Sequence, residues 1–376
     1  MMDMDTPLYH FGPTAQLLLL GTLVAALPLA WVVWQFRGQG RHALVTRLTW
    51  VTLFLTFDLV LFGAFTRLSD SGLGCPDWPG CYGQATPVGA RSQIQAAQDL
   101  MPTGPVTHGK AWVEMVHRYL ATGVGGLILT LCAMAWYRHR RGEQNAGVWG
   151  ATLTLVWVCV QGAFGALTVT MKLFPAIVTL HLMGGMVLLA LLARQAALLQ
   201  NSLTPQRVAR DPRLRPWLAA GLLVLGVQIA LGGWVSTNYA VLVCDTFPRC
   251  QGSFWPEMAF DLGFQLWRPL GFTAWGELLP FQALTAIHYT HRLAAYAVVC
   301  VMIALSWGMY RRGLPGLGRA LAVLVALQSL TGLSNVVLGW PMVAAVLHTG
   351  GAAAMVVVLV LAWQQASSSI LTRNIA

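Results

Sequence analysis

The feature that most constrains this chain is a series of nine apolar segments, each long enough to cross a lipid bilayer. A helix needs roughly 20 residues to span the hydrocarbon core. The segments lie at residues 14–35, 47–66, 112–136, 148–170, 175–199, 216–238, 281–309, 318–340 and 342–363. Lipid offers the backbone no hydrogen-bond partners, so segments of this length must become helices. The sequence predicts an all-α polytopic membrane protein.

Charge is scarce and unevenly placed. Only 10% of the residues are charged, whereas soluble domains carry about 25%. Basic residues cluster in every second link between apolar segments: Arg37, Arg41 and Arg47; Arg138, Arg140 and Arg141; Arg207, Arg210, Arg213 and Arg215; Arg311, Arg312 and Arg319. By the positive-inside rule these links are cytoplasmic. The net charge of +10 therefore indicates orientation in a plasma (inner) membrane, with the N-terminus outside and the C-terminus cytoplasmic, and does not indicate nucleic-acid binding.

The last eight segments form an internal repeat of four plus four. Four motifs recur in the same order: Gly63-Ala64-Phe65-Thr66 and Gly233-Trp234-Val235-Ser236; His117-Arg118 and His291-Arg292; Gln161 with Gly165 and Gln328 with Gly332; His181 with Gly184-Gly185 and His348 with Gly350-Gly351. Duplicated membrane folds commonly place their sites within or between such repeats. We expect two pseudo-repeated four-helix bundles, an eight-helix core, plus an extra N-terminal transmembrane helix.

This repeat predicts the organisation of the chain. Residues 1–44 hold the N-terminal helix and its link, 45–200 the first four-helix half, 201–215 a cytoplasmic linker and 216–376 the second half. The first helix follows an acidic start, whereas a cleaved signal peptide begins with basic residues. We therefore expect it to be retained.

Four histidines lie inside the predicted spans: His117, His181, His291 and His348. Each lies about six to ten residues into a helix that starts at the outer surface, hence roughly 9–15 Å deep. A single histidine at that depth is often only a packed polar residue, but repetition in both halves favours a function. Two imidazoles on different helices of a bundle can face a flat ring, and imidazole is a suitable ligand for iron. The sequence predicts one haem in each half.

The residues beside these histidines differ between the halves. Glu114 precedes His117 by three residues on the same helical face, whereas His288 stands at the matching place before His291. Glu114 could move protons or stabilise positive charge during oxidation of a haem substituent, or only favour the helix dipole. This difference suggests chemistry in the first half alone; His288 could be a polar contact or an alternative ligand.

Other polar residues leave alternatives open. Arg118 and Arg292, each next to a candidate ligand, could pair with haem propionates or extend toward lipid phosphate. Asp58, the other intramembrane acid, is matched with Gln228 and could serve a proton path or a hydrogen bond within the bundle.

Four cysteines form two equally spaced pairs, Cys75–Cys81 and Cys244–Cys250, in links without basic clusters. Those links should face the oxidising side of the membrane, where disulfides persist. The disulfides could fold the loops as lids over the haem sites, or take part in thiol–disulfide exchange. Cys132, Cys159 and Cys300 lie in apolar segments and are expected to be inert.

The stretch from Gly63 to Cys75, GAFTRLSDSGLGC, together with Glu114-Met115-Val116-His117-Arg118, resembles the haem A synthases of bacteria and mitochondria. The resemblance covers residues of about 45–365. It implies oxidation of a methyl group of haem O to the formyl group of haem A by successive hydroxylations, for cytochrome oxidase. It also implies partners: a haem O synthase that hands over the substrate, cytochrome oxidase assembly factors, and an unidentified electron acceptor.

The resemblance also assigns roles to the motif residues. It implies that His117 and His181 ligate the substrate haem, with Glu114 as the catalytic carboxylate, and that His291 and His348 ligate a resident haem b. The segment 14–35 departs from the eight-helix family core. Two other functions stay open: a dihaem b-type cytochrome that transfers electrons from quinol, and a thiol oxidoreductase that uses the outer cysteines.

Overall fold

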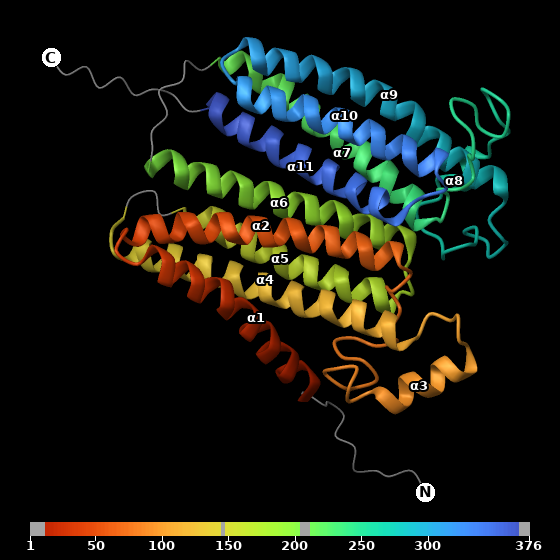
Figure 1. Ribbon diagram of the computed structural model, residues 1–376, viewed down its shortest axis with the longest axis horizontal. Coiled ribbons are helices and arrows are strands. Elements are labelled where there is room, and N and C mark those ends of the chain that lie inside the picture. Colours follow the sequence, from red (N-terminus) through yellow and green to blue (C-terminus); the bar gives the residue numbers. More distant parts are fainter. Residues whose placement is uncertain (1–11, 144–146, 204–210, 368–376) are drawn as a thin grey trace, which may run out of the picture.

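The computed structural model describes residues 12–143, 147–203 and 211–367, and within them it is helical (Figure 1). The helices are α1 (Gly12–Phe36), α2 (Arg41–Leu68), α3 (Arg91–Leu100), α4 (His108–Arg140), α5 (Val148–Thr170), α6 (Pro175–Leu203), α7 (Arg215–Thr237), α8 (Phe260–Gly263), α9 (Phe281–Arg311), α10 (Pro315–Val337) and α11 (Met342–Ser367), with a 3₁₀ turn at Pro212–Leu214. Nine helical segments in this part of the chain are long and apolar enough to span a membrane. The predicted all-α polytopic fold class is confirmed.

The eight core helices form two four-helix bundles. In the first, α2 and α5 each pack against both α4 and α6; in the second, α7 and α10 each pack against both α9 and α11. Helices α4 and α6 are therefore diagonal to one another, as are α9 and α11. Figure 1 shows the two bundles side by side. The residue boundaries predicted for the halves stay a prediction.

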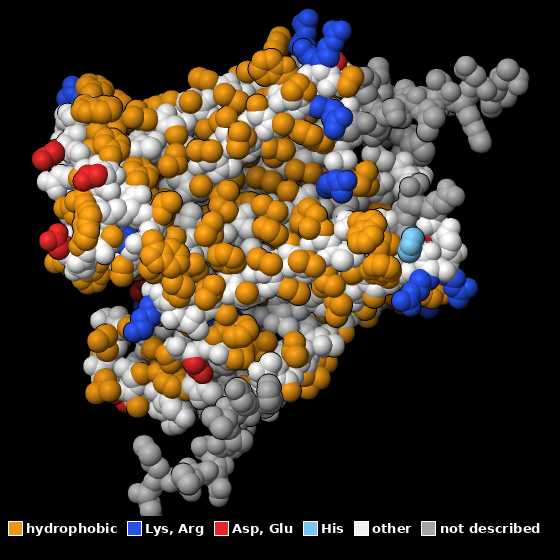
Figure 2. Space-filling view, turned by 180° about the vertical axis from the view of Figure 1, so that it is seen from behind, with side chains coloured by type: hydrophobic (Ala, Val, Ile, Leu, Met, Phe, Trp, Pro, Cys, Tyr) orange, Lys and Arg blue, Asp and Glu red, His pale blue; other side chains and the backbone are white. Residues whose placement is uncertain are grey.

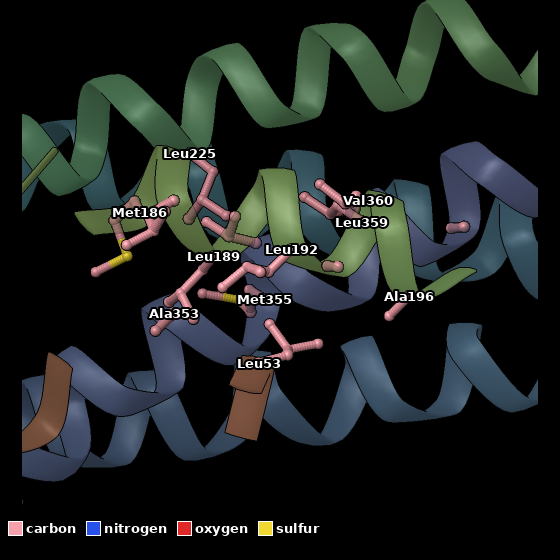
Figure 3. Close-up of a cluster of buried hydrophobic side chains, with 14 of the residues drawn as sticks. Leu53, Met186, Leu189, Leu192, Ala196, Leu225, Ala353, Met355, Leu359 and Val360 are labelled. Atoms are coloured by element: carbon pink, nitrogen blue, oxygen red, sulfur yellow. The ribbon is translucent and has the colours of Figure 1, made fainter. Parts of the chain in front are cut away.

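The hydrophobic core lies where the two bundles meet. Helices α2 and α6 of the first half contact α11 of the second, and α6 also contacts α7. Figure 3 shows side chains of this cluster from all four helices, among them Leu53, Leu189, Leu225 and Leu359. Because small residues such as Ala353 and Ala196 are fully buried there, the helices approach closely, as in other membrane bundles.

The extra helix α1 packs on the outside of the first bundle, mainly against α4 (Figure 1). The contact is built from small residues: a Cβ on Gly21 would lie 2.2 Å from Thr122, and one on Gly123 would lie 2.7 Å from Val24. An alanine at either position would force the helices apart. This close approach is the common way in which transmembrane helices associate without a hydrophobic driving force.

The flank of the molecule is apolar and its ends are polar. Figure 2 shows hydrophobic side chains over most of the flank, with most Lys and Arg gathered at one end and acidic side chains mainly at the other. The long loops that contain α3 and α8 both lie at the end opposite the basic links (Figure 1). These short helices were not predicted, because their segments are polar or Gly- and Pro-rich and too short to give a clear period.

Candidate haem sites

The four predicted histidines lie in two pairs, one inside each bundle. His117 and His181 are on the diagonal helices α4 and α6, and His291 and His348 are on the diagonal helices α9 and α11. Within each pair, the two histidine helices pack against the same two neighbouring helices. All four helices start at the end that carries the long loops. The structure thus brings each pair together at a similar depth.

Each imidazole rests against a glycine of a neighbouring helix. A Cβ added to Gly63 would lie 3.1 Å from Cε1 of His117, and one on Gly165 would lie 3.5 Å from Cε1 of His181. In the second bundle, the distances are 2.9 Å from Gly232 to His291 and 3.0 Å from Gly332 to His348. Three of these spaces are too tight for an alanine without a shift. The glycines therefore leave room for the rings inside the bundle.

This contact corrects the predicted register of the repeat by one residue. The repeat motifs predict that Gly63 corresponds to Gly233, but a Cβ on Gly233 would meet Thr179 and Leu182 and not a histidine. Gly232 is the true counterpart, and it also lies as far before Cys244 as Gly63 lies before Cys75. The pair Gly232-Gly233 allows two alignments of the motif, and both the packing against His291 and the spacing to Cys244 select Gly232.

The free ring nitrogens fit a bis-histidine haem. Among the described residues, Nε2 of none of the four histidines makes a hydrogen bond, whereas Nδ1 is either hydrogen-bonded or buried. Neutral imidazole can bind iron through one nitrogen while the other keeps its proton. In the described part of the chain, no group of three or more His, Cys, Asp or Glu side chains comes together as a metal cluster. Two imidazoles on diagonal helices, with no third ligand of this kind beside them in the described residues, therefore suit an iron porphyrin better than a zinc site.

Glu114 connects the first histidine helix to the disulfide loop above it. Its carboxylate accepts a hydrogen bond from the backbone N–H of Cys75 (2.8 Å) and pairs with Arg118, one turn further along α4. Arg118 in turn donates to the carbonyl oxygens of Asp77 (3.0 Å) and Pro79 (3.1 Å) and to that of Gly80. Both side chains are buried. The carboxylate is thus held in a fixed orientation, on the helical face that carries His117.

The second half repeats this arrangement with a histidine in place of the carboxylate. Arg292 donates to the carbonyl oxygens of Cys244 (2.7 Å) and Thr246 (2.8 Å), and its Nε contacts Nε2 of His288 at 3.1 Å. Nδ1 of His288 contacts the carbonyl oxygen of Ala240 at 2.7 Å. Both ring nitrogens of His288 are therefore used, which agrees with the polar contact and not with an alternative ligand.

The arginines beside the ligands hold loops in this structure. Their place in the sequence predicts contacts of Arg118 and Arg292 with haem propionates or lipid phosphate, but it does not predict the contacts of their guanidinium groups with loop carbonyl oxygens. A propionate contact stays a prediction. Asp58 lies on the exposed side of α2, and the proton path stays a prediction as well.

A polar cluster that the sequence did not predict joins the halves at the loop end. Asp70 accepts hydrogen bonds from Tyr239 (2.8 Å) and Lys110 (3.1 Å), while the Arg67 guanidinium carbon lies 4.1 Å from the ring centroid of Tyr239. Although burial alone would raise it, these two hydrogen bonds hold the pKa of Asp70 below its ordinary value. Arg67 also donates to the carbonyl oxygen of Ser236 (2.7 Å). The only sequence signal was the charge that directly follows the span 47–66.

Both cysteine pairs are disulfides, Cys75–Cys81 and Cys244–Cys250. Each of the four cysteines is no more than 1% exposed. Thiol–disulfide exchange needs a sulfur that a thiolate can reach, so the burial favours a structural role.

Replacing Cys75 and Cys81 by Ser is therefore expected to lower stability more than product formed per bound haem. The small ring closed by this disulfide positions the N–H that holds Glu114, and losing a disulfide typically costs about 2–5 kcal/mol in small domains. The measurements are thermal unfolding in detergent and turnover per haem. A well-folded variant with no turnover would support a redox role for the cysteines.

Comparison with known proteins gives a consistent result. The profile of the COX15-CtaA family, described as cytochrome oxidase assembly protein, matches residues 46–360. A protein of Shewanella oneidensis named heme A synthase is 37% identical over 335 residues, which are 86% of this chain and 99% of that protein. Heme A synthases of Rhizorhabdus wittichii and Caulobacter vibrioides are 27% and 29% identical, over 82% and 81% of this chain and 89% and 90% of their own lengths. The chain therefore belongs to the COX15-CtaA family of cytochrome oxidase assembly proteins.

Proposed function

We propose that this protein is a haem A synthase, which oxidises a methyl group of haem O to a formyl group. Two successive hydroxylations carry the methyl group to a geminal diol, which loses water to give the aldehyde. Each hydroxylation takes its oxygen atom from water and releases two electrons and two protons, so an electron acceptor is required. The observation that carries the proposal is the arrangement of two histidine pairs in matching bundles, with a buried carboxylate, Glu114, beside only one pair. The names of the relatives support it.

The first half would hold the substrate. His117 and His181 would ligate the iron of haem O, and the glycines behind them leave room for the Cε1 edges of the two rings beside α2 and α5. Glu114 would accept a proton released during oxidation, or stabilise the positive charge that develops at the substituent. Its contacts with Cys75 and Arg118 keep it from rotating away. A preorganised carboxylate of this kind needs no rearrangement during the reaction.

The second half would hold a resident haem b between His291 and His348. Such a group, when bound, supplies a one-electron path between the substrate site and an acceptor. The two bundles share their core through α2, α6, α7 and α11. The protein therefore keeps the two sites at a fixed separation.

The structure also supports the proposed orientation in the inner membrane. Most Lys and Arg gather at one end (Figure 2), and the loops that hold the two disulfides lie at the other, with α3 and α8 (Figure 1). With the basic end in the cytoplasm, both histidine pairs lie near the outer face and the N-terminus is outside. The substrate would come from a haem O synthase in the same membrane, and the product would pass to cytochrome oxidase assembly factors.

Extraction of pigment from the purified protein tests this function. We expect low-spin haem b together with haem O or haem A as a second, sub-stoichiometric species, because a substrate site releases its product. The measurement is chromatography of the extracted haems with mass analysis. Two stoichiometric haem b groups and no other haem would instead favour the dihaem cytochrome that oxidises quinol. The similar placement of the two histidine pairs is also compatible with such a cytochrome.

A further inference from the structure

The two histidine pairs differ in what lies behind their rings. In the second bundle, Nδ1 of His291 is 3.0 Å from Nε2 of Gln228, and Nδ1 of His348 is 3.0 Å from the hydroxyl oxygen of Thr331. In the first bundle, Nδ1 of His117 and Nδ1 of His181 are buried and have no protein hydrogen-bond partner among the described residues. Both histidines of the second half are thus held by a side chain at Nδ1, whereas neither histidine of the first half is.

The sequence explains this difference once the register is corrected. With Gly63 matched to Gly232, the counterpart of Gln228 is Leu59. With Gly165 matched to Gly332, the counterpart of Thr331 is Phe164. Leu59 and Phe164 carry no hydrogen-bonding group. The first half therefore lacks these contacts because of the residues that it has, and not because of how its side chains are turned.

The direction of the hydrogen bond between Thr331 and His348 leaves Nε2 of His348 free to bind iron. The Thr331 hydroxyl donates to the carbonyl oxygen of Leu327 (2.9 Å), so toward His348 it acts as an acceptor. It therefore holds the proton of the ring on Nδ1 and leaves the lone pair on Nε2 for a metal.

Gln228 can act in the same way on His291. Its Nε2 also contacts the carbonyl oxygen of His291 at 3.2 Å, while its Oε1 has no partner. The two ends of a glutamine amide are nearly isosteric. A turn of 180° exchanges the contact of Nε2 with the His291 carbonyl for a hydrogen bond in which Oε1 accepts from Nδ1–H of the ring. In that orientation both second-half imidazoles keep their proton on Nδ1 and leave the lone pair of Nε2 free for a metal.

We propose that Gln228 and Thr331 are positioning residues that make the second pair a permanent haem site, whereas the first pair is built for a haem that exchanges. This inference rests on the proposed function. A hydrogen bond from the outer ring nitrogen fixes the orientation of a ligand histidine and makes it a stronger donor to the metal, and losing it typically costs about 10–100-fold in metal affinity. An enzyme that must release one haem and keep the other needs this difference between its two pairs.

Haem transfer to excess apomyoglobin tests the proposal on the full chain. In the unaltered protein, we expect haem O or haem A to leave first and haem b to stay. Thr331→Val keeps the shape of the side chain and removes the hydroxyl, and it is expected to speed the loss of haem b by about 10–100-fold. It should also raise the midpoint potential of haem b, because a weaker donor stabilises ferric iron less. Gln228→Leu should act in the same direction.

Two variants separate positioning from general stability. Thr331→Ser retains the hydroxyl and is expected to restore both the rate and the potential. Ser329→Ala is the matched control, because Ser329 lies on the same helix and donates only to the carbonyl oxygen of Val325 (2.9 Å). Unchanged haem b loss and potential in both Thr331→Val and Gln228→Leu would overturn the proposal, and so would equal exchange rates of the two haems in the unaltered protein. Protein that shows this asymmetry but makes no haem A would instead refute the proposed function alone.

Discussion

Replacing Glu114 by Gln is expected to stop formyl formation while both haems stay bound. General acid–base groups typically contribute about 10²–10⁴-fold to a rate, and Glu114 is the one buried carboxylate on the face of α4 that carries His117. Glutamine keeps the length of the side chain and an oxygen for the Cys75 N–H, but it can neither take up a proton nor offset positive charge. The measurement is haem A formed per bound haem, from extracted pigment.

Two control variants distinguish a direct role of Glu114 in the reaction from a structural role in holding the disulfide loop. Breaking a buried ion pair typically costs about 3–5 kcal/mol, so thermal unfolding must be followed in the same samples. Arg118→Gln removes the same pair but keeps the carboxylate, and it is expected to lower stability more than turnover per haem. His288→Gln, at the matching place in the second half, should leave turnover per haem nearly unchanged. Equal loss of turnover in Glu114→Gln and Arg118→Gln would mean that Glu114 acts by holding the loop in place and not in the chemistry.

The fold could be predicted because lipid limits the options. An apolar segment of about 20 residues must satisfy its own backbone hydrogen bonds, and the repeat then grouped eight helices in two sets of four. The four histidines could be identified for a related reason. A polar side chain inside the membrane is energetically costly, so its repetition at one depth indicates a function. Their pairing followed from the repeat and needed no knowledge of contacts. Helix ends were less exact: α2 starts at Arg41 and not at 47, because its polar first turn lies outside the apolar window.

What the sequence did not predict depends on contacts between distant segments. The loops held by Arg118 and Arg292 are folded back by disulfides, and their carbonyl oxygens come within reach only in three dimensions. Arg268 is fully buried and donates to Asn238 (2.6 Å), yet its surroundings in the sequence are those of an ordinary polar loop. Gln228 was matched with Asp58 by position, whereas its contact is with His291 on another helix.

Replacing either His181 or His348 by Ala is expected to remove one haem and to abolish haem A formation. An alanine leaves an iron with one protein ligand, so the low-spin spectrum of that site should be lost and its haem released. His181→Ala should remove the substrate haem and leave haem b bound, whereas His348→Ala should remove haem b and leave the first pair able to bind haem O. The measurements are haem content by type, optical spectrum and product yield.

The two variants are expected to fail for different reasons, and this contrast tests the division of labour. His181→Ala removes the site of oxidation, so no intermediate should form on any substituent. His348→Ala leaves the substrate in place beside Glu114 and removes the electron path, so haem O should accumulate in the protein unchanged. His108→Ala is the control, because His108 lies at the start of α4 and contacts Gln95 of α3 and not a partner histidine. If both variants kept two low-spin haems, the imidazoles could not be the ligands. The glycine-backed pairs would then be packing features of a duplicated bundle, and a different site would have to hold the haem.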